Sequence, residues 1–106
     1  MDNLFRVCST KDVPLGDVRV VVVDHREIAV FNINHSYYAM DNLCPHRGAP
    51  LSDGRLEGHI VTCPWHGWQF DVTTGKLGLN PQTCQKTYPV EIRGGTLFLR
   101  LGENKK

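Results

Sequence analysis

Short apolar runs separated by polar turns extend along most of the chain. The first of them are VRVVVVD (18–24), IAVFNI (28–33) and YYAM (37–40), with the polar segments DHRE (24–27) and NHS (34–36) between them. Runs of about four to eight residues that are rich in Val, Ile, Tyr and Phe and bounded by polar residues are typical of β-strands. The pattern therefore predicts three strands that form an antiparallel meander.

The second half of the chain has the same character. Its last two apolar runs, TYPVEI and TLFLRL, are joined by Arg93-Gly94-Gly95, which predicts a hairpin. The strands expected here are HIVTC (59–63), WQFDV (68–72), TYPVEI (87–92) and TLFLRL (96–101), with a turn at TTGK (73–76).

No stretch shows helical periodicity long enough to predict a helix, and the chain contains no internal repeat. The fold class expected is all-β, an antiparallel strand framework of the sandwich or barrel type. We expect residues 1–106 to form a single domain. Its middle third, about residues 42–83, contains most of the unusual side chains and is expected to form a small subdomain within the framework.

Composition narrows the classes of partner. The formal net charge is +1, with 41% hydrophobic and 22% charged residues. Because Lys and Arg do not cluster beyond the pair at the C-terminus, nucleic acid is not expected as a partner. No apolar run approaches the roughly 20 residues of a membrane span, so no membrane association is expected.

Whether the four cysteines form disulfides depends on the cellular compartment of the protein. The N-terminal residues lack the basic start and apolar segment of a secretory signal, so we expect a cytoplasmic protein. In a reducing compartment cysteines are thiols or metal ligands more often than disulfides. The cysteines are Cys8, Cys44, Cys63 and Cys84.

Two of these cysteines stand beside histidines. CPHRGAP (44–50) contains Cys44-x-His46, and CPWHGW (63–68) contains Cys63-x-x-His66. Two thiolates and two imidazoles suit either zinc or a two-iron cluster. Zinc fingers usually group their cysteines in one knuckle and their histidines in another, whereas here each segment supplies one of each. This arrangement favours a site with two metal ions.

The two segments resemble the signature of the Rieske iron–sulfur proteins. The resemblance covers residues 44–76 and includes Gly48 and Gly67 after the ligand positions, while NPQ (80–82) stands where the family has a third, proline-bearing loop. The resemblance implies one [2Fe–2S] cluster, with two cysteines on one iron and two histidines on the other. The cofactor-binding and metal-ligating residues it implies are Cys44, His46, Cys63 and His66.

The same resemblance implies a function. Both irons of such a cluster are fully coordinated, so one-electron transfer is expected rather than catalysis. The chain is similar to the Rieske ferredoxins of bacterial aromatic-ring-hydroxylating dioxygenase systems. The partners implied are an NAD(P)H-dependent flavoprotein reductase as donor and a terminal oxygenase as acceptor, both docking transiently near His46 and His66. We expect a monomer.

The residues around the ligands predict a low reduction potential. High-potential Rieske proteins carry an extra cysteine in each loop, together with a serine and a tyrosine that donate hydrogen bonds to the cluster sulfurs. The corresponding residues here are Ala49, Trp65, Trp68 and Phe70. We therefore expect a potential near the bottom of the Rieske range, which runs from about −150 to +300 mV.

The remaining candidates have ordinary interpretations. Cys8 and Cys84 are expected to be unligated thiols, because neither has a histidine nearby. His25, His35 and His59 are not expected to bind metal. Trp68 is expected in the core, whereas Trp65 suits either a docking patch or packing over the cluster. Arg47 is expected to be a solvated loop charge.

Two other functions stay open on sequence grounds, and a third is disfavoured. One is the small Rieske subunit of an assimilatory NADH nitrite reductase or another redox complex. Another is a structural zinc-binding module. An oxygenase would need a second, mononuclear iron, for which the chain is too short, and its remaining histidines do not cluster with an acid.

Overall fold

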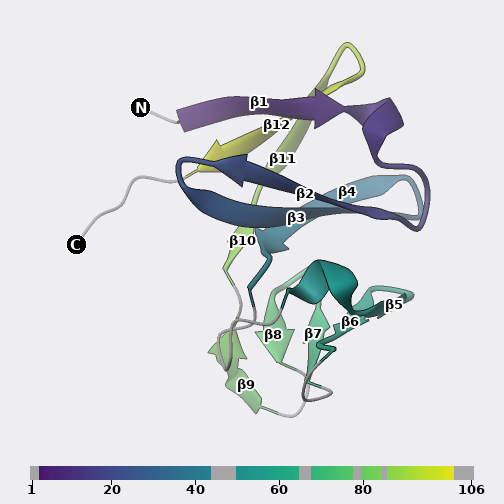
Figure 1. The fold of residues 1–106 in the computed structure, drawn as a ribbon, viewed down its shortest axis with the longest axis vertical. Coiled ribbons are helices and arrows are strands. Elements are labelled where there is room, and N and C mark those ends of the chain that lie inside the picture. Colours follow the sequence, from purple (N-terminus) through teal and green to yellow (C-terminus); the bar gives the residue numbers. More distant parts are fainter. Residues whose placement is uncertain (1–2, 44–49, 65–67, 78–79, 85, 102–106) are drawn as a thin grey trace.

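The computed structural model describes residues 3–43, 50–64, 68–77, 80–84 and 86–101, which form three antiparallel β-sheets and two short 3-10 helices (Figure 1). In the first sheet, β12 (Thr96–Leu101) lies between β1 (Asn3–Ser9) and β11 (Val90–Arg93). The second sheet has the order β10 (Thr87–Tyr88), β4 (Ser36–Asp41), β3 (Arg26–Ile33) and β2 (Val18–Val23). The third contains, in chain order, β5 (Arg55–Glu57), β6 (Ile60–Thr62), β7 (Gln69–Asp71), β8 (Lys76–Leu77) and β9 (Asn80–Cys84). The helices are η1 (Thr10–Asp12) and η2 (Leu51–Asp53).

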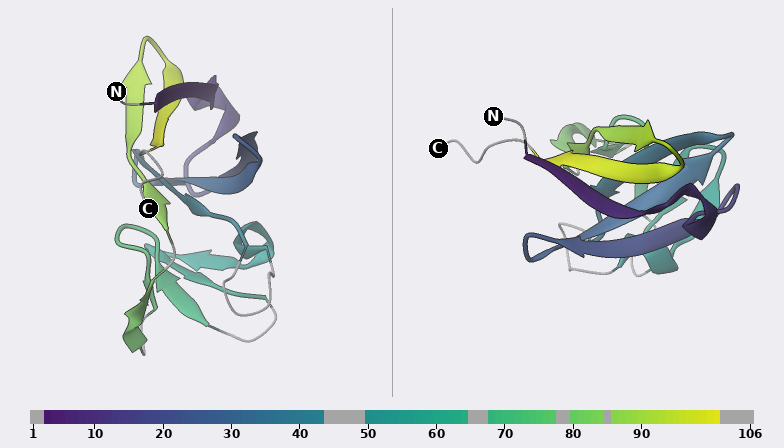
Figure 2. Two further views of the ribbon diagram at one scale, coloured as in Figure 1. Left: turned by 90° about the vertical axis from the view of Figure 1, so that its left-hand side faces the viewer. Right: turned by 90° about the horizontal axis from the view of Figure 1, so that it is seen from above.

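The first two sheets pack face to face, and the third lies beside the second at one end of the molecule (Figures 1 and 2). Each contact between layers has its own hydrophobic core. Between the first and second sheets the core is Val13, Val23, Ile28, Val30, Ala39, Tyr88, Leu97, Leu99 and Leu101. Between the second sheet and the third-sheet region it is Ala29, Phe31, Met40, Leu51, Val61, Cys63, Phe70 and Val72.

Strand β3 separates the two cores. Successive side chains of a strand point to opposite faces, so Ile28 and Val30 enter one core while Ala29 and Phe31 enter the other. A strand that is buried on both faces must be apolar at consecutive positions. The continuous run IAVF therefore marks the strand to which the framework and the third sheet are both attached.

The meander of β2, β3 and β4 confirms the predicted order, but its turns are shorter than expected. Asp24 and His25 have φ of 54° and 66°, and Asn34 and His35 have φ of 53° and 71°. Two consecutive residues at positive φ form the hairpin turn that suits the twist of the flanking strands. The strands therefore extend to Arg26 and Ser36, which the sequence placed in turns.

The predicted strand 87–92 is two strands. Pro89 separates β10, which pairs with β4, from β11, which pairs with β12. A proline lacks the N–H that a continuous ladder needs, and here the chain passes from one sheet to another at that residue. The hairpin of β11 and β12 is confirmed, with its turn at Gly94 and Gly95.

NPQ (80–82) is also corrected, because these residues begin β9 rather than a loop. Strand β9 pairs with β8 through Leu77–Asn80 and Lys76–Cys84, with an irregularity between the two pairs. The strand lies at the edge of the third sheet, where a proline is tolerated. Strand β1 was not predicted from the sequence, and it completes the first sheet by pairing with β12.

Candidate metal centre

The second cysteine–histidine segment begins at the end of a hairpin. Strands β6 and β7 pair from Ile60–Asp71 to Thr62–Gln69. One position beyond, the backbone N–H of Cys63 donates to the carbonyl oxygen of Trp68 at 2.7 Å. This hydrogen bond closes the base of the loop from Cys63 to Trp68, and it places the thiol at the start of that loop.

The Cys63 side chain is 2% exposed and belongs to the core that contains Phe70 and Leu51. Trp68 is half-buried against this core, with its ring centroid 6.3 Å from that of Phe70. Trp68 was predicted in the core, and the structure places it against the core and half-buried rather than within it. The residues around Cys63 make an apolar wall, which limits the access of water to any group bound there.

The first cysteine–histidine segment has an equally closed base. Leu43 and Pro50 form an antiparallel bridge. Next to it, the backbone N–H of Leu51 donates to the Asn42 carbonyl oxygen at 2.6 Å. The described chain after β4 ends at Leu43, and it lies beside this same point when it resumes at Pro50.

The two loop bases are in contact through η2 and the residue that follows it. Gly54 lies against the backbone of Thr62, the residue before Cys63, and a Cβ atom at Gly54 would stand 2.0 Å from the Thr62 carbonyl oxygen. Leu51, in η2, is completely buried in the core that contains Cys63. The fold therefore brings the returning end of the first loop to the strand from which the second loop begins.

Of the four residues predicted as ligands, the structure describes Cys63. The other three, Cys44, His46 and His66, lie outside the described residues, as do Arg47, Gly48, Ala49, Trp65 and Gly67. Within the part of the chain that is described, no three metal-binding side chains form a group. The chemistry of the described donor fits an iron–sulfur group, since a thiol that is buried among apolar side chains is a soft ligand for iron.

The other candidate ligands have the environments expected of them, as far as they are described. Cys8 is a free, half-buried thiol, and burial together with the Asp12 charge raises its pKa, although Arg19 acts in the opposite direction. His25 and His35 occupy the hairpin turns. The Cys84 side chain lies outside the description.

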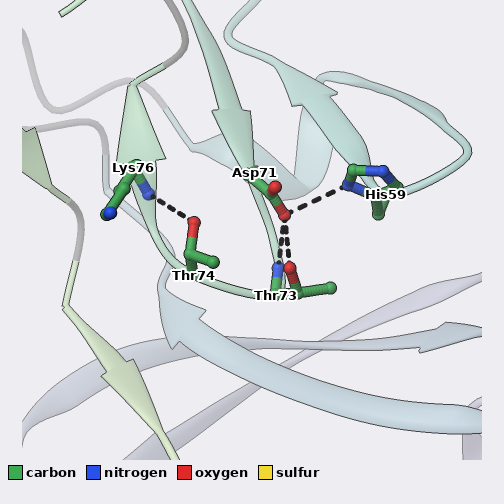
Figure 3. Close-up of polar contacts among 5 residues, drawn as sticks. All are labelled: His59, Asp71, Thr73, Thr74 and Lys76. Atoms are coloured by element: carbon green, nitrogen blue, oxygen red, sulfur yellow. Dashed lines mark hydrogen bonds and ion pairs between the residues drawn. The ribbon is translucent and has the colours of Figure 1, made fainter. Parts of the chain in front are cut away.

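His59 is paired with a carboxylate at the end of the β6–β7 hairpin (Figure 3). Its Nδ1 lies 3.1 Å from Oδ1 of Asp71, and that oxygen also accepts hydrogen bonds from the Thr73 backbone N–H at 2.9 Å and from the Thr73 hydroxyl at 2.6 Å. Burial acts to raise the pKa of Asp71, but these hydrogen bonds and the His59 charge lower it overall. The group closes the end of the β6–β7 hairpin that is opposite Cys63.

A protein-family model of the Rieske [2Fe-2S] domain matches residues 3–89. The chain belongs to the Rieske [2Fe–2S] family. The predicted all-β Rieske fold and the [2Fe–2S] cofactor are thereby confirmed, and a cluster of this type has two Cys and two His ligands. In the described part of this Rieske domain, no helix is long and apolar enough to cross a membrane.

The similarity to known proteins covers most of this Rieske chain. The ferredoxin component of the naphthalene 1,2-dioxygenase/salicylate 5-hydroxylase systems of Ralstonia sp is 46% identical over 91 residues, 85% of this chain and 88% of that protein. The solved structure of the Sphingomonas yanoikuyae B1 ferredoxin is 36% identical, with a TM-score of 0.86 over 94% of this chain and 100% of that chain. A chain in the complex of reduced oxygenase and oxidized ferredoxin in carbazole 1,9a-dioxygenase is 29% identical, with a TM-score of 0.84 over 97% of both chains.

Two residues of the Rieske site were missed from the sequence. Asn42 is a buried polar residue at the base of the first loop, and Gly54 makes the contact with Thr62 possible. The only signal in the sequence was the position of an asparagine two residues before Cys44. An asparagine or glycine near a loop is common, so the residue types alone did not distinguish them from ordinary loop residues.

Proposed function

We propose that this chain is a one-electron carrier, the ferredoxin component of a ring-hydroxylating oxygenase system. It receives electrons from an NAD(P)H-dependent flavoprotein reductase and passes them to a terminal oxygenase. The observation that carries the proposal is the likeness to ferredoxin components along most of the chain, up to 48% identity over 85% of it. An electron carrier needs no substrate pocket of its own, because it reacts by docking.

We assign the four ligands by the family pattern, with Cys44 and Cys63 on one iron and His46 and His66 on the other. The contact between Gly54 and Thr62 supports this assignment, because it joins described residues that flank the two segments containing the four residues. When bound, the cluster supplies reversible one-electron reduction. The apolar core residues around the Cys63 thiol limit the access of water to it.

The rest of the proposal concerns organisation. We propose that residues 1–106 act as a single Rieske domain, with residues of about 42–83 as its cluster-binding subdomain, and that the protein works in the cytoplasm as a monomer. Docking in a carrier should be brief, with an interface under about 1,200 Å² in total.

The ligand assignment is tested by metal analysis and by EPR of dithionite-reduced protein purified without added metal. We expect iron and acid-labile sulfide in equal amounts and a signal with the low average g-value of mixed Cys and His ligation. Cys63→Ser should lose both, while Cys8→Ser, at a thiol without a ligand role, should keep them. Stoichiometric zinc without iron would instead support the structural module.

The carrier function is tested by reconstitution with a reductase and a terminal oxygenase of a naphthalene dioxygenase system. We expect oxygenase turnover that depends on the concentration of this protein, and no product when the reduced protein alone receives dioxygen and the aromatic substrate. A holoprotein that is reduced normally but supports no oxygenase would contradict the proposal. Co-purification with a nitrite reductase would support that alternative host.

A further inference from the structure

Asn42, just before the first ligand segment, makes hydrogen bonds with the residues that follow this segment and with the framework. It is the last residue but one before Cys44, and it is 1% exposed. Its backbone carbonyl oxygen accepts from the N–H of Leu51 at 2.6 Å, and its side-chain Oδ1 accepts from the N–H of Ser52 at 2.8 Å. One residue before the loop thus holds two successive residues after it.

The other two bonds of Asn42 join this loop base to β3. The backbone N–H of Asn42 donates to the Glu27 carbonyl oxygen at 2.8 Å, and its side-chain Nδ2 donates to Oε1 of Glu27 at 3.2 Å. Strand β3 is buried on both faces, so it is a rigid support. A backbone–backbone ladder alone would use only the main chain of Asn42, whereas here the side chain duplicates both links.

The bonds of Asn42 continue to the second loop through η2. Leu51 and Ser52, which Asn42 holds, are the first two residues of η2, and Gly54 after it lies against Thr62, next to Cys63. A displacement of the Asn42 side chain would therefore move the end of the first loop relative to the second. The separation of the loops decides the geometry of the ligands that they supply.

We propose that Asn42 is a positioning residue for the cluster, and that Glu27 is the framework residue that orients its side-chain amide. The inference rests on the proposed function only in taking Cys44, His46, Cys63 and His66 as the ligands. A side chain at this position must accept from Ser52 and donate to Glu27 at the same time. Asparagine does both, whereas an ionised aspartate can only accept.

The test exchanges donor and acceptor. In Asn42→Asp, a carboxylate oxygen faces the Glu27 carboxylate in place of a donor, so the link is broken and the buried geometry is disturbed. We expect iron release to a chelator to become about tenfold faster, and the g-values of the reduced cluster to shift. Glu27→Gln alone retains an acceptor for Nδ2 of Asn42 and should behave as wild type.

The double variant Glu27→Gln with Asn42→Asp restores the link in reverse, since the amide of residue 27 can donate to the carboxylate of residue 42. We expect its rate of iron release to return to within about twofold of wild type, and its g-values to return as well. Glu57→Ala, which removes an exposed carboxylate paired with Arg55, is the control for loss of charge and should leave both unchanged. Wild-type rates and g-values in Asn42→Asp, or a double variant as impaired as Asn42→Asp, would overturn the inference.

A variant at a solvent-exposed position keeps the inference testable if Asn42→Asp does not fold. Glu27 has an exposed side chain, and Glu27→Ala removes the acceptor for the Asn42 side-chain amide. It should accelerate iron release about threefold, and an unchanged rate would overturn the inference. Wild-type holoprotein without a Rieske EPR signal is a different result, because it would contradict the proposed function and not the role of Asn42.

Discussion

Gly54 lies so close to the backbone of Thr62 that a Cβ atom at position 54 would stand 2.0 Å from the Thr62 carbonyl oxygen and 3.1 Å from that of Leu51. Both neighbours are backbone atoms, so neither can move aside by changing a rotamer. The φ of Gly54 is −83°, within the range of any residue. Position 54 therefore requires glycine because a larger residue would not fit between the bases of the two ligand loops.

Gly54→Ala should therefore separate the loops and destabilise the protein. Overpacking typically costs about 1–3 kcal/mol, and we expect a loss near the upper end of that range because the obstacle is backbone. Urea unfolding of the holoprotein would measure the change in stability. The iron content would show whether the separated loops still hold the cluster.

The matched control for this substitution is Gly58→Ala. Gly58 has a φ of 62° and no atom within 4 Å of an added Cβ, so it should lose only about 1 kcal/mol from backbone strain and keep its iron. Equal losses of stability and iron in the two variants would show that the contact with Thr62 has no special role.

Tyr88 should make the stability fall at high pH. Its hydroxyl donates to Oδ1 of Asp41 at 2.5 Å. Burial, this hydrogen bond and the Asp41 charge raise the pKa of Tyr88 from 10.0 to about 12, although Arg26 acts in the opposite direction. The folded state holds the proton more tightly than the unfolded state, so the stabilisation is complete below about pH 10 and is lost as the pH rises towards about 12.

Tyr88→Phe isolates this effect, because phenylalanine does not titrate. At pH 8 we expect the variant to be less stable by about 2 kcal/mol, the value of a hydrogen bond to a charged group. The difference from wild type should shrink between about pH 10 and 12. Denaturant titrations of both proteins at several pH values would measure it, and a difference that stayed constant would contradict the prediction.

Asp71 should act in the opposite pH range. Burial would raise its pKa, but hydrogen bonds from Thr73 and the contact with His59 lower it overall. The carboxylate therefore stabilises the folded state above its ordinary pKa of 3.8, and this contribution is lost as the pH falls through the lower pKa of the folded state.

Asp71→Asn should cost about 1 kcal/mol at pH 6, because the amide is a weaker acceptor for the Thr73 donors. The deficit should diminish below about pH 4 as the wild-type carboxyl group is protonated. Asp53→Asn, at an exposed position of η2, is the charge-matched control and should show no such dependence. Thermal unfolding at pH 6 and pH 3 would distinguish the two variants.

Phe70 should keep the reduction potential low. The side chain is completely buried, in the same core as Cys63, and has no hydroxyl to donate. In the family pattern, high-potential members have a tyrosine at this position. Phe70→Tyr should raise the midpoint potential by about 50 mV, the equivalent of a hydrogen bond of about 1 kcal/mol to the reduced cluster.

Protein-film voltammetry of both holoproteins would test this prediction. The wild-type midpoint should lie near the lower limit of the Rieske range, about −150 mV. A wild-type midpoint well above zero would contradict the interpretation of the whole site. A lower melting temperature with no change in potential would show that the new hydroxyl does not reach the cluster.

Much of the fold was predictable from local patterns. The run IAVF predicted a strand, and its burial on both faces agrees with its continuous apolar character. TLFLRL was predicted with its correct ends, because it is a short apolar run and Gly94 and Gly95 form the turn before it. Such patterns reflect whether each residue is buried or exposed. The family signature indicated which residues bind the metal.

What the sequence by itself determined is therefore the fold class, most of the strands and the family of the cofactor. The tertiary structure decided which segments meet. Pro89 transfers the chain between sheets, Tyr88 reaches Asp41 across 47 positions, and Asn42 joins Glu27 to η2. Periodicity reflects local burial only, whereas pairing depends on long-range packing and on the satisfaction of every buried polar group, which no short stretch of sequence contains.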